Sequence, residues 1–123
     1  MNPVANVSVT GFAATADGDD RHIMVTLKGE ADQRAKPHLE GFFRAVHEAA
    51  LRGRSLVRID LTGLQFMNSS GLQEFVTWFS EVTKSPAGTG YQVRFVADLT
   101  QYWQRRSLQA LVAFAPDHVA VDA

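Results

Sequence analysis

The chain has 123 residues, of which 46% are hydrophobic and 20% are charged, and its formal net charge is −1. This length and composition are typical of one globular domain and exclude a disordered or fibrous chain. The chain has no cysteine, which excludes disulfides, thiolate zinc sites and a cysteine nucleophile. We therefore expect a single domain over residues 1–123. Its basic residues form no stripe, which argues against nucleic-acid binding.

The sequence gives no sign of export or of membrane insertion. Residues 1–10 lack the basic and apolar regions of a secretory signal. No apolar run approaches the ~20 residues that a membrane-spanning helix needs. The absence of cysteine also suits a reducing compartment. We expect a cytoplasmic protein with no direct membrane insertion.

The first 28 residues predict two strands joined by a turn. Residues 4–12 alternate loosely between apolar and polar side chains, which indicates a weak strand. Residues 16–20 read Ala-Asp-Gly-Asp-Asp, a turn signal. Residues 22–28 alternate more clearly and predict a second strand. Two such strands around a turn predict a hairpin.

The middle of the chain predicts two amphipathic helices around a buried strand. Pro37 is favoured in the first turn of a helix and Gly53 just beyond its end, so residues 37–52 predict the first helix. Residues 56–61 are rich in Leu, Val and Ile and predict a short strand. Residues 72–82 repeat apolar side chains at helical spacing and predict the second helix.

The last third of the chain predicts a strand, a helix and a final short strand. Residues 91–97 form the strand, Thr100 caps a third helix that runs to about Phe114, and residues 118–121 form the last strand. The predicted order is β-β-α-β-α-β-α-β. Strands that alternate with helices predict an α/β fold in which the helices cover the sheet. The initial hairpin makes this sheet mixed.

Asn68-Ser69-Ser70-Gly71 opens the second predicted helix. In α/β sheets, sites gather at the carboxyl ends of strands and at helix N-termini. The unpaired N–H groups and the macrodipole of a helix N-terminus favour an anion, so a phosphate on a serine here would be stabilised. Asn and Ser are also the preferred N-cap residues, which accounts for them without any function. Both explanations hold if one side chain caps the helix and a hydroxyl is modified.

Two motifs in the chain together resemble the STAS domain family, the sulphate-transporter and anti-sigma-factor-antagonist family. Residues 56–72, LVRIDLTGLQFMNSSGL, are similar to its strand, Asp-Leu pair, short loop and Asp-Ser-Ser-Gly or Asp-Ser-Thr-Gly motif. Residues 29–32, Gly-Glu-Ala-Asp, are similar to its Gly-Glu-Leu-Asp motif. The resemblance covers about residues 5–115 and implies a STAS-like mixed sheet covered by amphipathic helices. Asn68 replaces the motif aspartate and the segment 101–114 is atypical, which indicates a divergent branch.

The resemblance implies a phosphorylation switch of the anti-sigma-factor-antagonist type. In such proteins the first serine of the motif is phosphorylated by the partner, a serine kinase of the histidine-kinase-type ATPase class that is itself the anti-sigma factor. Phosphorylation releases the partner, and a phosphatase resets the protein. On this chain the phosphoacceptor would be Ser69, and Asn68, Ser70, Gly71 and Asp32 would contribute to partner binding. The docking face would include residues 62–68 and the second helix.

Other functions remain open at this point. Some STAS-like proteins are non-phosphorylated cytoplasmic subunits of membrane transporters, and Asn68 suits that role. Ser70 is an alternative phosphoacceptor. Trp78 and Tyr102 lie off the main apolar stripes and are either interface residues or residues at the edge of the core.

An enzymatic function has little support in the sequence. Ser69 lacks the G-x-S-x-G frame of a hydrolase nucleophile, and the four histidines lack the spacing of a metal-binding helix face. No acid, base, nucleophile and cofactor-binding set converges. We therefore expect no catalytic residues, no cofactor and no metal.

Overall fold

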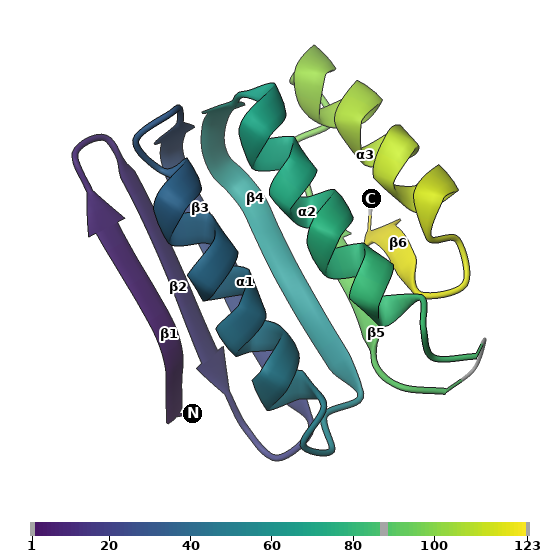
Figure 1. Cartoon of the computed structure of the whole chain (residues 1–123). Coiled ribbons are helices and arrows are strands. Elements are labelled where there is room, and N and C mark those ends of the chain that lie inside the picture. Colours follow the sequence, from purple (N-terminus) through teal and green to yellow (C-terminus); the bar gives the residue numbers. More distant parts are fainter. Residues whose placement is uncertain (1, 87–88, 123) are drawn as a thin grey trace.

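A computed structural model describes residues 2–86 and 89–122 as one six-stranded sheet with three helices (Figure 1). The strand order is β1-β2-β3-β4-β5-β6; β1, β2 and β3 pair antiparallel, and β3 to β6 pair parallel. The predicted α/β class with a mixed sheet is therefore confirmed. The elements are β1 Asn2–Val9, β2 Phe12–Gly18, β3 His22–Ala31, α1 Lys36–Ala50, β4 Leu56–Met67, α2 Ser69–Val82, β5 Gln92–Val96, α3 Tyr102–Phe114 and β6 Val119–Asp122.

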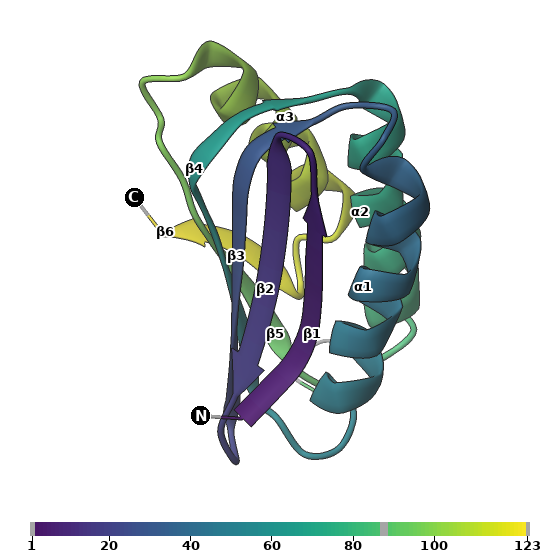
Figure 2. The same cartoon turned by 90° about the vertical axis from the view of Figure 1, so that its left-hand side faces the viewer.

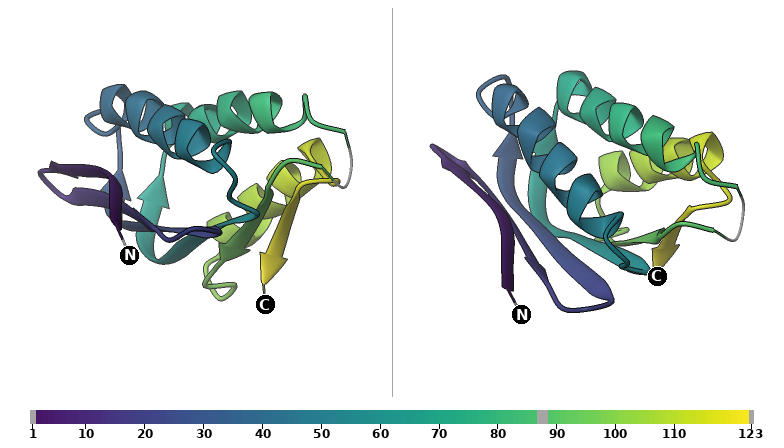
Figure 3. Two further views of the ribbon diagram at one scale, coloured as in Figure 1. Left: turned by 90° about the horizontal axis from the view of Figure 1, so that it is seen from below. Right: turned by 60° about the horizontal axis from the view of Figure 1, so that its bottom comes forward.

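All three helices lie on one face of the sheet (Figures 1 and 2). Each helix connects two neighbouring parallel strands, and each connection moves one strand further in the same direction. Because such connections are right-handed, successive helices must fall on the same side. The views from below show α1 and α2 side by side above the twisted sheet (Figure 3). Within the described residues, no helix is long and apolar enough to cross a membrane.

The chain forms three strands before the first helix, where the sequence predicted two. The first turn falls at residues 10–11, where Gly11 has a φ of 81° and Val9 pairs with Phe12. The predicted turn at 16–20 is displaced, because β2 continues through Gly18. The strand β2 has the sequence FAATADG, and the prediction missed it because alanine is a weak strand former.

The strand β4 is twice as long as the sequence predicted. We expected a strand over residues 56–61 and a loop over 62–68, but β4 ends only at Met67. Its first five residues pair with both β3 and β5, whereas its second half pairs with β3 alone. Register shifts in the β3 ladder break the two-residue alternation that identifies a strand in sequence. The expected docking loop is therefore mostly a strand, and within the described residues no other strand pairs with its second edge.

The predicted cap of the third helix was wrong by one residue. The residue that precedes α3 is Gln101, and its side chain makes no capping bond. The Thr100 hydroxyl instead donates to Asp98 Oδ1 at 2.6 Å, and the Thr100 N–H donates to the same oxygen at 3.1 Å. These two bonds form an Asx turn before the helix starts, and they engage the Thr100 hydroxyl that was expected to cap the helix.

The core lies between the helices and the sheet and is rich in aromatic rings. Phe43 of α1 stacks on Phe75 of α2 with ring centroids 4.6 Å apart, and Phe75 meets Phe95 of β5 edge to face. Such pairs each contribute about 0.5–1.5 kcal/mol beyond their buried area. Trp78 is only 4% exposed, so its interface interpretation was wrong, whereas Tyr102 is 61% exposed.

Candidate functional site

The two sequence motifs meet at one edge of the sheet, where β3 and β4 end (Figure 1). Ala31 pairs with Met67 in the parallel ladder. The Asn68 N–H then donates to the Ala31 carbonyl at 3.0 Å. The carboxyl ends of the two strands therefore bring Asp32 and residues 68–71 to the same edge.

The glycine of the first motif allows a close backbone contact with the first turn. Gly29 has a φ of 92°, and the Glu30 N–H donates to the Gly11 carbonyl at 2.8 Å. A Cβ added to Gly29 would lie 2.1 Å from the Gly11 oxygen, which no side chain can tolerate. Positive φ and this contact both require glycine at position 29. The β1–β2 turn is thereby fixed against the start of the site.

Asp32 is a half-buried residue whose carboxylate is held by Arg34. Arg34 Nη2 lies 2.8 Å from Asp32 Oδ2, and the Arg34 N–H donates to Oδ1 at 2.9 Å. The side-chain hydrogen bonds from Arg34 lower the pKa of Asp32, so this carboxylate is ionised at neutral pH. Within the described residues, Asp32 makes no hydrogen bond to residues 68–71. No three His, Asp or Glu side chains of the described part of the chain gather to hold a metal ion.

Asn68 is the N-cap of α2. Its Oδ1 accepts a hydrogen bond from the Gly71 N–H at 2.9 Å, and its backbone is extended, with φ −76° and ψ 172°. This is the geometry of an N-cap, so the capping role follows directly from the residue type. Because the amide oxygen accepts this bond, the Nδ2 group is the part of the Asn68 side chain that remains to donate.

Gly71 is buried, and packing explains why this position needs a glycine. A Cβ at this position would approach Met67 Cγ to 2.8 Å, so a larger residue would displace the Met67 side chain from the core. The sequence suggested that Gly71 lets a partner approach closely. The structure places Gly71 inside the protein, behind Ser69 and Ser70.

Ser69 is the accessible hydroxyl of the site. It is the first residue of α2 and is exposed, whereas Ser70 is half-buried. Among the described residues, neither hydroxyl has a hydrogen-bond partner. The first turn of α2 contains no acidic residue, so the positive end of the helix dipole is uncompensated there. The first turn of α2 therefore adds no negative charge that would repel a phosphate on Ser69.

The capping role of Asn68 predicts a stability difference between two variants. Asn68→Ala should lower the free energy of unfolding by about 1 kcal/mol, because the Gly71 N–H loses its acceptor. Asn68→Asp should leave it within about 0.5 kcal/mol, because a carboxylate caps equally well. Urea unfolding of the three proteins measures both changes. An unchanged alanine variant would show that the cap contributes nothing.

Two residues of α3 that the sequence analysis missed bind the second half of β4, the half that does not pair with β5. Gln104 is fully buried, and its Nε2 donates to the carbonyls of Leu61 at 2.8 Å and Leu64 at 2.9 Å. Trp103 Nε1 donates to the Gln65 carbonyl at 3.1 Å. These bonds replace the partners that β5 does not supply. The signal in sequence was the atypical segment 101–114, but nothing in it showed which carbonyls it would meet.

The chain was compared with protein families, curated proteins and solved structures. No protein-family model and no curated protein sequence matches it. An anti-sigma factor antagonist from Mycobacterium paratuberculosis superposes with a TM-score of 0.64 at 22% identity, over 85% of this chain and 83% of that one. The anti-sigma factor antagonist SpoIIAA in its unphosphorylated form superposes with a TM-score of 0.61 at 16% identity, over 89% and 88%.

A third similar structure carries the same fold without an established function. This uncharacterised protein of the DUF3478 family from Shewanella loihica PV-4, described as having a SpoIIAA-like fold, superposes with a TM-score of 0.57 at 14% identity, over 99% of this chain and 90% of that one. The chain therefore has the SpoIIAA-like fold of STAS domains, as its motifs predicted. At these identities the likeness shows the fold alone.

Proposed function

We propose that the chain is a regulatory protein-binding module of the anti-sigma-factor-antagonist type. The observation that carries this proposal is the position of Ser69, which is exposed at the N-terminus of α2 on this fold. Asn68, Ser70 and Asp32 complete the partner-binding face, together with the second half of β4; Gly71 is buried and contributes through its packing against Met67. The partner is an anti-sigma factor that acts as a serine kinase of the histidine-kinase-type ATPase class.

Phosphorylation of Ser69 switches the module off. A phosphoserine adds about −1.5 to −2 charges and three acceptor oxygens to the centre of the face. The dipole of α2 and the Asn68 amide stabilise this charge within the free protein. In the complex, the same charge must be desolvated against the partner, which favours dissociation. A phosphatase that removes the group restores binding.

The amide at position 68 is compatible with this switch. A carboxylate there could take the serine proton, and an amide cannot. Protein kinases, however, supply the catalytic base themselves. The amide also repels a phosphate less than an aspartate would. The switch therefore needs no acid at position 68.

Ser69→Glu should weaken binding of the partner kinase about tenfold or more, while Ser69→Ala keeps the affinity of the unmodified protein. The reason is the charge placed at the centre of the docking face. Calorimetry with a purified partner kinase of the histidine-kinase-type ATPase class measures the effect. Ser80→Glu is the matched control, because Ser80 is exposed on the same helix and its hydroxyl bonds only the Val76 carbonyl. Equal affinities for all four proteins would contradict the proposal.

The state of Ser69 in the native host tests the chemistry directly. We expect the intact mass of the native protein to include a form with one phosphoryl group, mapped to Ser69. A group on Ser70 would keep the switch and correct the acceptor. An unmodified protein under growth and under stress would favour the second candidate, a non-phosphorylated subunit of a membrane transporter, which Asn68 also fits.

A further inference from the structure

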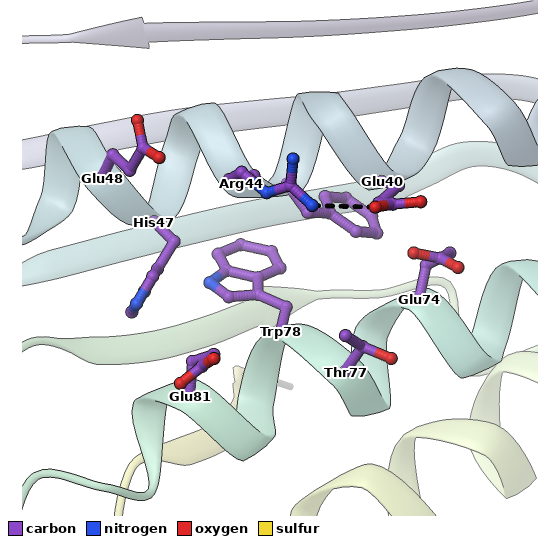
Figure 4. A pocket seen from close by; sticks show the side chains of 9 residues that line it. Glu40, Arg44, His47, Glu48, Glu74, Thr77, Trp78 and Glu81 are labelled. Atoms are coloured by element: carbon purple, nitrogen blue, oxygen red, sulfur yellow. Dashed lines mark hydrogen bonds and ion pairs between the residues drawn. The ribbon is translucent and has the colours of Figure 1, made fainter.

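A second feature on the helical face lies away from the Ser69 surface. A groove of about 620 Å³ runs between α1 and α2. Figure 4 shows Glu40, Arg44 and Glu48 along the α1 side, Glu74 and Glu81 along the α2 side, and Trp78 between the two helices. We call this the acidic groove. Its two rims come from residues at helical spacing, so each rim is a straight row along its helix.

The acidic groove concentrates negative charge on a nearly neutral protein. Its four glutamates, counted with Arg44 and with the Lys84 that pairs with Glu81, leave it two charges negative, while the whole chain carries only −1. Glu40 pairs with Arg44 at 2.8 Å and Glu81 with Lys84 at 2.6 Å. In the described part of the chain, Glu48 and Glu74 have no ion pair. One free carboxylate therefore stands on each rim.

The base of the acidic groove is joined by side-chain hydrogen bonds and carries no compensating positive charge. Tyr91 Oη accepts from Trp78 Nε1 at 2.8 Å and lies 2.7 Å from His47 Nδ1, which joins α2, α1 and the residue that precedes β5. Burial lowers the pKa of His47, and the nearby Glu81 and Glu48 only partly oppose this shift. His47 is therefore neutral at pH 7. Phe43 and Trp78 are 2% and 4% exposed, so they close the floor.

We propose that the acidic groove docks a lysine- and arginine-bearing helix of a protein partner. Glu40 and Glu48 are two helical turns apart, about 12 Å, and Glu74 and Glu81 about 10 Å. On the partner helix, basic residues spaced three, four and seven apart match both rows of glutamates. Because the floor is closed, charge pairing carries the binding, and salt weakens it. This docking does not depend on the state of Ser69.

A designed peptide tests the acidic groove without a known partner. The probe is a fluorescein-labelled 15-residue helix with Lys and Arg on both flanks of an alanine stripe, and its control carries Glu in place of every basic residue. We expect the basic peptide alone to bind in an anisotropy titration. Amide shifts in ¹⁵N spectra should fall on residues 40–48 and 74–81. Shifts confined to other surfaces would overturn the proposal.

Variants that each change one charge identify the carboxylates that bind the basic peptide. Glu48→Gln and Glu74→Gln should each weaken the basic peptide about two- to fivefold, and Arg44→Gln should strengthen it by a similar factor. Asp20→Asn and Asp117→Asn remove one negative charge from turns outside the groove and serve as controls. Ser69→Ala should bind unchanged. Equal weakening by groove and control variants would reduce the effect to net charge and overturn the proposal.

Two other occupants give distinct results. Spermidine that binds the same residues as tightly as the peptide would assign the acidic groove to small polycations. A protein dimer in sedimentation experiments that Glu48→Gln or Glu74→Gln dissolves would assign it to a second copy of the chain. Either result would overturn the proposal that a partner helix docks in the acidic groove. If the proposed switch at Ser69 fails its own test, the results of these measurements on the acidic groove do not change.

Discussion

Replacing Gly29 by alanine should lower the free energy of unfolding by about 3–5 kcal/mol. A positive φ alone costs an L-residue about 1–2 kcal/mol. The larger part comes from the Cβ, which would lie 2.1 Å from the Gly11 carbonyl oxygen and 3.3 Å from Phe12 Cα. Both are backbone atoms, so relief requires the β1–β2 turn to move away. Thermal unfolding should shift downward by about 10–20 °C.

Two other glycines separate the steric from the conformational part of this effect. Gly53 has a φ of 104° and open space around its Cβ position, so Gly53→Ala should lose only about 1 kcal/mol. Gly41 lies within α1 with nothing within 4 Å, so Gly41→Ala should gain about 0.5–1 kcal/mol. A Gly29 variant no less stable than the Gly53 variant would show that the turn yields freely.

The second large effect is expected at Gln104. Gln104→Leu keeps the volume of the side chain but should lower the free energy of unfolding by about 2–4 kcal/mol. It removes the donor to Leu61 and Leu64 and the acceptor, 3.0 Å away, of the Asp98 N–H. These backbone groups would then lack partners beside a buried apolar side chain. Urea unfolding and hydrogen exchange of residues 61–68 measure the loss.

Gln101→Leu is the matched control for Gln104. Gln101 is only part-buried, and its bonds to Leu64 O and Asp98 Oδ2 are both 3.4 Å long. It also accepts from Trp103 Nε1 at 2.9 Å, but that N–H keeps the Gln65 carbonyl as an acceptor in the variant. We therefore expect a loss below about 1 kcal/mol. The Gln104 variant should also expose the segment that leads into Ser69, and so raise exchange there first. A Gln104 variant as stable as the Gln101 variant would show that water replaces these bonds.

The helices and central strands follow from local patterns. Residues 37–52 and 72–82 were predicted as helices and fall on α1 and α2, because their apolar stripes repeat at 3.6 residues. Residues 91–97 were predicted as a strand and overlap β5, because their apolar side chains alternate with a period of two residues. The prediction failed at β2 and at the second half of β4. There, pairing with β3 holds segments whose own composition and alternation do not indicate a strand.

The sequence by itself determined the α/β class, the STAS resemblance and the start of a capped helix within residues 68–71. The fold class and the helix start rest on periodicity and on contacts within a few residues, and the resemblance rests on the two motifs at residues 29–32 and 56–72. Tertiary structure alone decided that Trp78 lies in the core, that Gln104 holds β4, and that glutamates of two helices form one groove. Each depends on groups distant in the chain, and only the assembled sheet and helices fix which of them meet.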